Sequence, residues 1–409
     1  LDTVTALIER IEKSLSEPNL LGDLEKIKAG KDQSIKRFHP WVFSGAVASI
    51  SELLSEGQLV EIVDHNENRL GWGHFSEGSI AVRMFSFGTE DFNSNIWEKK
   101  IQNAYHRRKN AQIIHEGTNL FRLIHAEGDG LPGVIIDVYN HTAVIQFHGA
   151  GMYQHRNEIA QAVVNVCGEF IHAVYNKSKE KLKSIPSEDG YLIGGAENHI
   201  AQENNIIFSI DWVQGQKTGF FIDQRDNRAL LGQLAHNKKV LNTFCYSGAF
   251  SMYALANGAS LVHSLDSSAG ALQLTEENVI LNGYPSEKHA CIQADAVHYL
   301  KNLNEDYDII VLDPPAFAKH LSARHKAIQG YRKINEAALR QIKSGGLLFT
   351  FSCSQVIDKD QFKSAILASA IAVGREVRIL HQLHQGADHP ISLFHSEGEY
   401  LKGLVLEVI

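Results

Sequence analysis

The feature that most constrains the fold is an alternation of strand-like and helix-like segments from about residue 236 onward. The strand candidates are Val240–Phe244, Leu261–Asp266, Ala290–Ala294, Asp308–Asp313, Leu347–Ser352, Glu376–Leu380 and Leu401–Val408. Helical spacing of apolar residues falls between them, at 248–257, 268–281, 295–302, 325–343 and 360–373. This alternation predicts a doubly wound, largely parallel sheet with right-handed crossovers. Ligands of such sheets bind at the carboxyl ends of the strands.

The preceding residues have a different texture. Apolar residues at helical spacing predict an amphipathic N-terminal helix over 1–23, which is compatible with a homodimer. Short apolar runs then predict a β-rich domain over 24–97, with hairpin connections at 66–68 and 71–73. A helix at 96–116 and further strands predict a central α+β domain over 98–200, and the alternating region completes a domain over 201–409.

Composition excludes several classes of protein. The sequence contains no window of 18 uninterrupted apolar residues, so no transmembrane helix is expected. The first residues do not have the pattern of a secretory signal. The four cysteines, Cys167, Cys245, Cys291 and Cys353, form no Cys-x-x-Cys pair, so we expect no structural zinc site and no disulfide scaffold. The 21 histidines are scattered, and no metal is expected. A reducing, cytoplasmic compartment follows as the expectation.

The net charge of −8 argues against a protein coated in nucleic acid, but it hides local basic patches. Residues 26–37 carry five basic side chains and one acidic one, among them Lys36 and Arg37. A second patch over 97–110 includes Arg107 and Arg108. Such patches suit a selective RNA partner, while solvated helix faces are an equally good interpretation of each patch alone.

Three strand ends predict a nucleoside-binding site. The turn Asn242–Gly248 follows the first strand and opens a helix, so its backbone N–H groups can face a ligand. Asp266 ends the next strand, where a carboxylate accepts ribose hydroxyls, and Asp295 follows the third strand, near an adenine edge. Either aspartate could instead be a helix N-cap. The absence of Gly-x-Gly-x-x-Gly argues against a dinucleotide, so the pattern favours S-adenosylmethionine.

Two further motifs carry chemistry. In Asp313-Pro314-Pro315-Ala316-Phe317, two prolines hold the aspartate at the mouth of the sheet. Amino-methyltransferases place an aromatic residue directly after a similar motif, and the intervening Ala316 argues against an exocyclic-amine substrate. In Ser352-Cys353-Ser354, Cys353 follows the fifth strand and is a candidate nucleophile, with a helix N-terminus expected to favour its thiolate. The alternative is a buried, inert cysteine.

These motifs together resemble those of the ribosomal RNA large-subunit methyltransferase I family. The likeness runs from about residue 24 to 409. His39–Ala46 resembles the start of an RNA-binding PUA domain, and His125–Gly133 resembles the central domain. Lys217–Arg225, Asp313–Phe317, Ser352–Ser354 and Tyr400–Gly403 resemble the catalytic domain. Residues 1–23 match nothing in the family.

The resemblance implies a class I, Rossmann-like methyltransferase domain behind a PUA-like β-barrel and a central α+β domain. It also implies formation of 5-methylcytidine in 23S rRNA, with Cys353 and Asp313 as catalytic residues. The residues expected to bind S-adenosylmethionine are Phe220, Asp223, Gln224, Arg225, Asn242, Phe244, Tyr246, Ser247, Gly248, Asp266, Ser267, Asn282, Asp295, Ala296, Asp313 and Pro314. Those expected to contact RNA are Lys36, Arg37, Arg107, Arg108, Pro315 and Phe317.

The expected chemistry begins with attack of Cys353 on C6 of a flipped cytosine, which makes C5 able to accept the methyl group. Asp313 would bond the N3/N4 edge. The base that then removes the C5 proton is not named by the sequence. Two alternatives stay open at this point: methylation of another base atom, such as an exocyclic amine or ring nitrogen, and an inactive RNA-binding protein on the same fold.

Overall fold

The computed structural model describes residues 23–48, 54–93, 95–183, 185–196, 198–303 and 305–409. The helix predicted over 1–23, and the dimer it was expected to support, lie outside the described residues apart from Asp23. Two compact units are present. The first comprises residues 1–114, 121–198 and 388–398, and the second comprises 115–120, 199–387 and 399–409.

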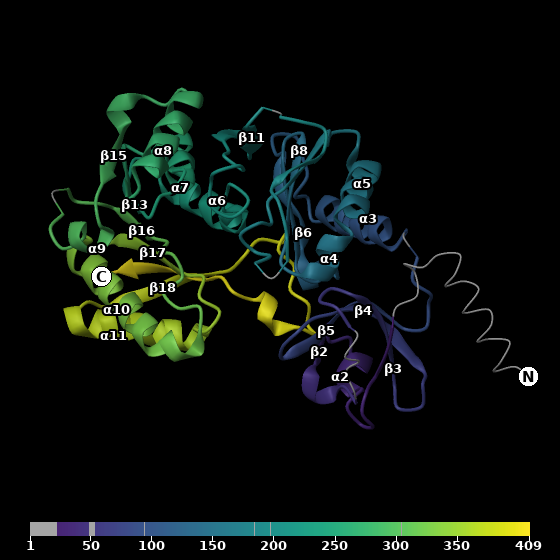
Figure 1. Ribbon diagram of the computed structural model, residues 1–409. Helices are drawn as coiled ribbons and strands as arrows, with labels where there is room; N and C mark the ends of the chain where they lie inside the picture. The colour runs from purple at the N-terminus through teal and green to yellow at the C-terminus, as the bar shows by residue number, and fades with distance from the viewer. Residues whose placement is uncertain (1–22, 49–53, 94, 184, 197, 304) are drawn as a thin grey trace, which may run out of the picture. The chain divides into compact units, whose positions relative to one another are not determined.

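The first unit contains two five-stranded sheets. One has the order β1-β3-β4-β5-β2, formed by Asp23–Lys26, Leu59–Val63, Arg69–Phe75, Ile80–Phe87 and Trp41–Phe43, with the short helix α2 at Gln33–Lys36. The other has the order β10-β9-β8-β7-β6, formed by Gly190–Ile193, Ala173–Asn176, Thr142–Phe147, Val134–Tyr139 and Leu120–His125. Three helices lie beside the second sheet (Figure 1): α3 (Asn95–Asn110), α4 (Ala150–Gln154) and α5 (Arg156–Cys167). Trp72 and Phe85 of the first sheet share one apolar core with Trp97 of α3.

The hairpin predicted at Gly71–Gly73 is wrong, because these residues lie inside strand β4. A Cβ atom at Gly71 would lie 2.1 Å from the carbonyl oxygen of Ser86, and one at Gly73 would lie 2.5 Å from Val82. The glycines therefore allow β5 to pack closely against β4, where a side chain would separate the two strands.

The second unit is built on a seven-stranded sheet of order β15-β14-β13-β16-β17-β19-β18. Its strands are His289–Gln293, Leu261–Asp266, Lys239–Thr243, Ile309–Leu312, Gly346–Ser352, Lys402–Val408 and Val377–Leu383. The first five are parallel, and β19 runs antiparallel to both neighbours. The prediction of a doubly wound, largely parallel sheet is confirmed. The order reverses between β13 and β16, which is where such sheets bind ligands.

Helices cover both faces of this sheet. They are α6 (Arg225–Leu234), α7 (Ala249–Ala256), α8 (Ala269–Leu281), α9 (Ala296–Tyr299), α10 (Arg324–Gln341) and α11 (Lys359–Val373). A hairpin of β11 (Ile200–Glu203) and β12 (Ile206–Ser209) precedes the sheet. Among the described residues, no helix is long and apolar enough to cross a membrane.

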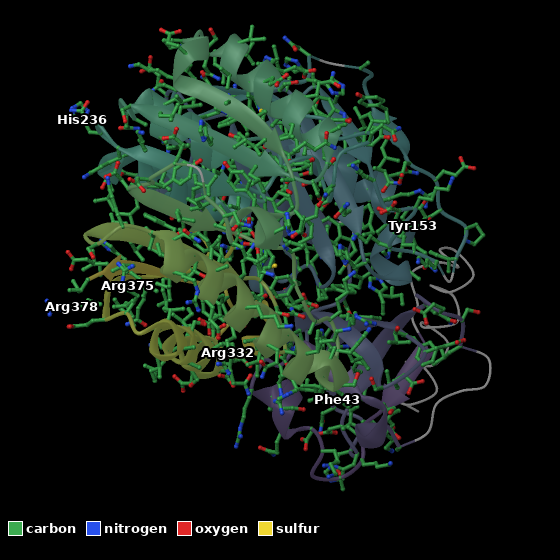
Figure 2. All side chains as sticks on the ribbon, turned by 90° about the vertical axis from the view of Figure 1, so that its left-hand side faces the viewer. Phe43, Tyr153, His236, Arg332, Arg375 and Arg378 are labelled. Carbon is green, nitrogen blue, oxygen red and sulfur yellow. The ribbon has the colours of Figure 1, made fainter. Side chains whose placement is uncertain are left out.

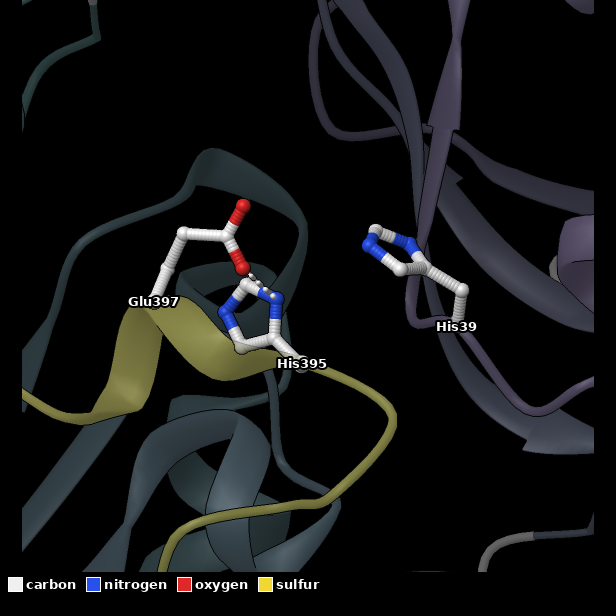
Figure 3. Close-up of side chains that lie close together, drawn as sticks. All are labelled: His39, His395 and Glu397. Atoms are coloured by element: carbon white, nitrogen blue, oxygen red, sulfur yellow. Dashed lines mark ion pairs between the residues drawn. The ribbon is translucent and has the colours of Figure 1, made fainter.

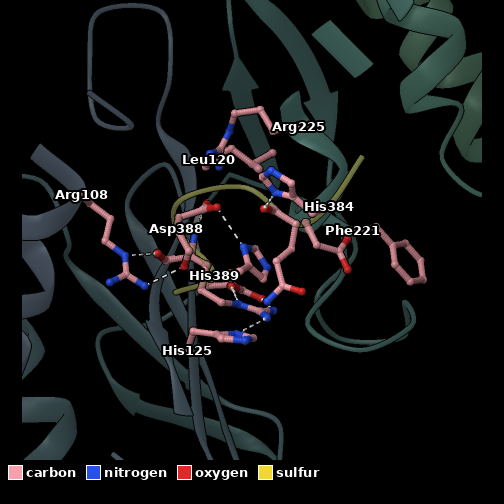
Figure 4. Close-up of polar contacts among 12 residues, drawn as sticks. Arg108, Leu120, His125, Phe221, Arg225, His384, Asp388 and His389 are labelled. Atoms are coloured by element: carbon pink, nitrogen blue, oxygen red, sulfur yellow. Dashed lines mark hydrogen bonds and ion pairs between the residues drawn. The ribbon is translucent and has the colours of Figure 1, made fainter. Parts of the chain in front are cut away.

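Arg108 belongs to a buried polar network in the first unit, and Figure 4 draws it together with His125, Asp388 and His389. Its guanidinium donates to both carboxylate oxygens of Asp129, at 2.6 and 2.7 Å, and to the carbonyl oxygen of Asp388 at 2.7 Å. The Asp388 carboxylate accepts a bond from the backbone N–H of Arg122, and His389 beside it lies against His125. The 388–398 segment, which connects β18 to β19, therefore completes the interior of the first unit.

The expectation that Arg108 contacts RNA is wrong. Its side chain is only 1% exposed, and its donors are used inside the protein. Arg107 differs, because its side chain is 48% exposed although it also reaches Asp129. The period of helix α3 turns the two neighbours in different directions, one inward and one outward.

We expect Arg108→Ala to lower the free energy of unfolding by about 3–5 kcal/mol, because it leaves the Asp129 charge buried without its main partner. Arg107→Ala is the matched control. It removes an exposed partner of the same carboxylate and should cost no more than about 1 kcal/mol. Thermal and urea unfolding of the two variants would measure the difference. Equal stabilities would contradict the assignment of Arg108 to the interior.

Candidate active site

A cavity of about 740 Å³ opens in the second unit around the carboxyl ends of β13, β14, β16 and β17. Twelve of the residues predicted for the site line it. They are Phe220, Asp223, Gln224, Phe244, Tyr246, Ser247, Asp266, Ser267, Asp313, Pro314, Pro315 and Cys353. The two catalytic candidates therefore share one cavity with the turn and with the acidic strand end predicted to bind the nucleoside.

The turn after β13 has an unusual backbone. Phe244 and Tyr246 adopt positive φ angles of 56° and 48°, and Gly248 follows with φ 72°. A Cβ atom at Gly248 would lie 2.4 Å from Thr275, so this position requires glycine. Non-glycine residues with positive φ are strained and cluster at functional sites. The strain is held in place by tertiary bonds, one of them from Thr275 Oγ1 to the Tyr246 carbonyl oxygen at 2.8 Å.

Asp266, at the end of β14, is hydrogen-bonded both to the turn after β13 and to the residues that follow β14. Its Oδ2 accepts a bond from the backbone N–H of Tyr246 at 3.1 Å, and its Oδ1 accepts one from Ser268 at 2.9 Å. The carboxylate thus lies in the cavity wall with its orientation fixed by two backbone donors. That is the placement a ribose-binding carboxylate needs.

Six predicted cofactor residues do not line the cavity. Asn242 bonds Ser251, Asn282 bonds the backbone of Ile207, and Asp295 caps helix α9 by accepting from His298. The remaining three are Gly248, which precedes α7, Ala296, which belongs to the apolar core, and Arg225, which pairs with Glu203. Asp295 therefore acts as the helix N-cap that the sequence offered as an alternative. Asn242, Asn282 and Arg225 bond other parts of the protein and so stabilise the fold around the cavity.

Asp313 follows β16 and is held by a short chain of amides. Gln224 Nε2 donates to its Oδ2 at 3.1 Å, and Asn227 Nδ2 donates to Gln224 Oε1 at 2.6 Å, which orients the Gln224 amide. Burial, together with the nearby charge of Asp223, raises the pKa of Asp313 from 3.8 to about 7. The carboxyl group is therefore able both to donate and to accept a hydrogen bond near neutral pH.

Cys353 follows β17, and its Sγ lies 4.0 Å from the carbonyl oxygen of Pro314. Burial, and next the charge of Asp313, raise the pKa of the thiol to about 11, while Lys217 acts in the opposite direction. The expectation that a helix N-terminus favours the thiolate is wrong, because the next helix, α11, begins only at Lys359. A ligand that brings positive charge into this cavity would lower the pKa of the thiol.

Two residues of the site were missed in the sequence, although both lie in its Tyr400-Leu401-Lys402-Gly403 motif. The Tyr400 hydroxyl donates to Asp223 Oδ2 at 2.6 Å. Lys402 Nζ donates to the carbonyl oxygens of Ser354 and Ile357, at 2.7 and 2.8 Å, and so holds the loop that carries Cys353. Burial lowers the pKa of Lys402 to about 8. The resemblance of this motif to the catalytic domain of the family was the signal that could have pointed to them.

Phe317 does not lie in the cavity. Its ring packs at 4.7 Å from that of Tyr331, a fully buried side chain of α10, and it covers Gly330. Pro315 from the same loop does line the cavity. The side chain of Phe317 is only partly buried, so its contact with RNA stays a prediction.

Comparisons with known proteins agree with this geometry. Residues 188–385 match the family described as S-adenosylmethionine-dependent methyltransferase, and residues 26–87 match a PUA-like domain. A ribosomal RNA large subunit methyltransferase I from Alteromonas mediterranea is 37% identical over 93% of this chain and 98% of its own length. One of the same name from Pseudoalteromonas atlantica is 38% identical, with the same coverage. The chain belongs to the ribosomal RNA large subunit methyltransferase I family.

Solved structures share the fold of this methyltransferase. A protein from Streptococcus mutans, described as a sam-dependent methyltransferase, has a TM-score of 0.80 at 23% identity, covering 94% of this chain and 100% of its own. Another structure, described as a methyltransferase complexed with SAH, has a TM-score of 0.81 with the same coverage. The predicted family and fold class are confirmed.

The cavity fits S-adenosylmethionine, the cofactor of this family. Its volume of about 740 Å³ suits a nucleoside with an amino-acid tail, and Asp266 in its lining would supply the carboxylate for the ribose hydroxyls. Phe244, Tyr246 and Ser247 would hold the ligand through the strained turn, and Ser267, which follows Asp266 in the cavity lining, would lie next to the ribose. When bound, the cofactor supplies an electrophilic methyl group and a positive sulfonium.

We expect Asp313→Asn to make Cys353 more reactive toward iodoacetamide. The negative charge of Asp313 raises the pKa of the Cys353 thiol, which is about 11. Removing this charge should lower that pKa, so the alkylation rate at pH 8 should rise several-fold. Peptide mass spectrometry would follow Cys353 separately from the other three cysteines. An unchanged rate would show that Asp313 does not act on the thiol.

Proposed function

We propose that this methyltransferase forms 5-methylcytidine in 23S rRNA through a covalent bond between Cys353 and C6 of the target cytosine. The observation that carries the proposal is the shared cavity: Cys353 and Asp313, from neighbouring strand ends, line the same space as the cofactor turn. The names of the relatives support ribosomal RNA as the substrate class. A cytoplasmic location follows from that substrate.

The chemistry explains why a thiol and a carboxyl group belong together here. C5 of cytosine is a poor nucleophile, and addition of the Cys353 sulfur to C6 gives C5 the electron density to take a methyl group. The addition places negative charge on the N3 side of the ring. Asp313, with a pKa near 7, stabilises that charge by donating a hydrogen bond.

Two alternatives are less well supported. Methylation of an exocyclic amine would call for an aromatic ring next to the two prolines, but Ala316 occupies that position and Phe317 packs on Tyr331. An inactive RNA-binding protein would not need a cavity in which the turn, Asp266, Asp313 and Cys353 all converge.

Cys353→Ala should abolish formation of 5-methylcytidine, while binding of S-adenosylmethionine stays within a few-fold of wild type because the turn and Asp266 are untouched. Nucleoside mass spectrometry of 23S rRNA treated with each protein would measure the product, and calorimetry would measure cofactor binding. Cys291→Ala is the matched control, since this thiol is partly exposed but does not line the cavity. Methylation of another atom, or full activity of Cys353→Ala, would refute the proposal.

We also propose that the first unit holds RNA on an aromatic and basic surface around β2. Phe38, Phe43 and Phe394 are about half exposed, and Figure 2 labels Phe43 on this sheet. The rings contact one another edge to face: the ring centroids of Phe38 and Phe394 are 5.5 Å apart, and those of Trp41 and His395 are 4.4 Å apart. Half-exposed rings of this kind stack on unpaired bases.

Positive charge borders this aromatic surface. Lys36 pairs with Asp32, but the exposed Lys31 and Arg37 have no carboxylate partner within the described parts of the chain. His39, His395 and Glu397 bring one polar atom each to within 4.8 Å of one another (Figure 3), and His395 among them is buried. We assign the partly exposed His39 to the RNA surface and propose no metal. Lys36 and Arg37 remain proposed RNA contacts, with Arg107 as a further exposed cation.

Phe43→Ala and Phe394→Ala should each weaken binding of a single-stranded rRNA fragment by about 1–3 kcal/mol, the usual worth of one base stacked on a ring. Arg37→Ala should instead lower the slope of log K against log salt by about 1. Leu367→Ala removes an equally exposed apolar side chain from α11 and serves as the control. Unchanged affinity for both phenylalanine variants would exclude this surface.

The domain boundaries are part of the proposal. We propose a PUA-like domain over 24–97, a central domain over 98–200 and a catalytic domain over 201–409. The matches at 26–87 and 188–385 support the first and the last. The 388–398 segment is an exception to a simple division, because it packs with the first unit.

A further inference from the structure

Methyl transfer to C5 leaves a hydrogen on that carbon, and a base must remove it before the enzyme is released. We infer that Asp223 is this base and that Tyr400 positions it. The inference rests on the proposed C5 chemistry and names a residue for its last step. From the sequence, Asp223 is expected only to bind the cofactor.

The cavity offers few candidates for the base. Five acidic side chains line it: Asp211, Asp223, Asp266, Glu277 and Asp313. Asp266 is fastened to the backbone of the cofactor turn, and Asp211 accepts bonds from the backbone N–H groups of Val213 and Gln214. The charges of two of the five, Asp313 and Asp223, raise the pKa of the Cys353 thiol.

The remaining lining groups are less suitable. His199 stacks on Trp212, with ring centroids 3.8 Å apart, and its Nδ1 bonds the carbonyl oxygen of Ile210. Lys217 lies over the Phe221 ring as a cation. Burial raises the pKa of Cys245 far above neutrality, so its thiol stays protonated. The choice therefore falls between Asp223 and Asp313, the two lining carboxyl groups whose charges act on the pKa of Cys353.

The hydrogen bonds separate the roles of these two groups. Asp313 receives an amide bond from Gln224, and its raised pKa suits a donor to the cytosine ring. Asp223 receives the Tyr400 hydroxyl at 2.6 Å on Oδ2, and this bond fixes the position of the carboxylate in the cavity wall. Two carboxyl groups in different environments form the pattern expected of an acid and a base.

The proposed step balances. Asp223 takes the C5 proton, the C5–H electron pair forms the C5=C6 double bond, and the bond from C6 to Cys353 Sγ breaks. The sulfur leaves with the electrons of that bond as a thiolate. The products are 5-methylcytosine, free Cys353 and a protonated Asp223, which returns its proton to solvent.

The test uses Asp223→Asn in the full-length protein with 23S rRNA and S-adenosylmethionine. Without the base, methyl transfer takes place but release does not, so a covalent protein–RNA adduct that survives sodium dodecyl sulfate should accumulate. Turnover should fall by about 10²–10⁴-fold, the usual contribution of a positioned base. Digestion of the adduct should yield a methylated cytosine bound to the Cys353 peptide.

Asp313→Asn distinguishes the two carboxyl groups, because it should slow addition to C6 and leave little adduct. Tyr400→Phe keeps the ring but removes the bond to Asp223, and it should slow release with a smaller build-up of adduct. Asp358→Asn is the matched control: this carboxylate caps α11 at the surface, and asparagine caps equally well.

The outcomes separate the two proposals. If the wild type forms no 5-methylcytidine, the proposed function fails, and the base fails with it. Two results would refute the role of Asp223 when the wild type does form 5-methylcytidine. In the first, Asp223→Asn turns over normally. In the second, Asp223→Asn binds the cofactor and loses turnover, but no covalent adduct accumulates. Should Asp223→Asn not bind cofactor, Tyr400→Phe decides: slower turnover with adduct supports the role, and any other result overturns it.

Discussion

The site depends on the parallel pairing of β13, β16 and β17. The register aligns Thr243 with Leu312 and Leu312 with Thr350, so the three strands end at nearly the same level. The residues that follow these ends, in the cofactor turn, in the Asp313 motif and in the Cys353 motif, therefore meet at one edge although they are far apart in sequence. A shift in this register would separate the carboxyl group from the thiol.

The same cavity wall makes the chemistry sensitive to charge. Burial raises the pKa of Asp313 to about 7 and that of Cys353 to about 11, and each value depends on neighbouring charges. At neutral pH the protein therefore holds the thiol mostly in its protonated form. Because a cationic ligand would reverse part of this effect, we expect binding of the positively charged cofactor to favour the Cys353 thiolate.

Much of the fold and part of the site could be predicted from the sequence. The alternation of strands and helices, the turn after β13, Asp266, Asp313 and Cys353 each leave a local pattern, and the structure brings the last four to one cavity. The burial of Arg108 could not be predicted, because the residue type alone does not show which way a side chain points. Arg108 lies against Asp129 and Asp388, the latter some 280 residues further along the chain.

The sequence by itself determined the order of the strands and helices, the family, and the residue types available for catalysis, since these follow from periodicity and local motifs. Only the tertiary structure decided which polar groups face the cavity and which serve the framework. It paired Tyr400 with Asp223, turned Asn282 toward the backbone of Ile207, and placed the 388–398 segment with the first unit. Such pairings depend on contacts between distant parts of the chain, which no local pattern encodes.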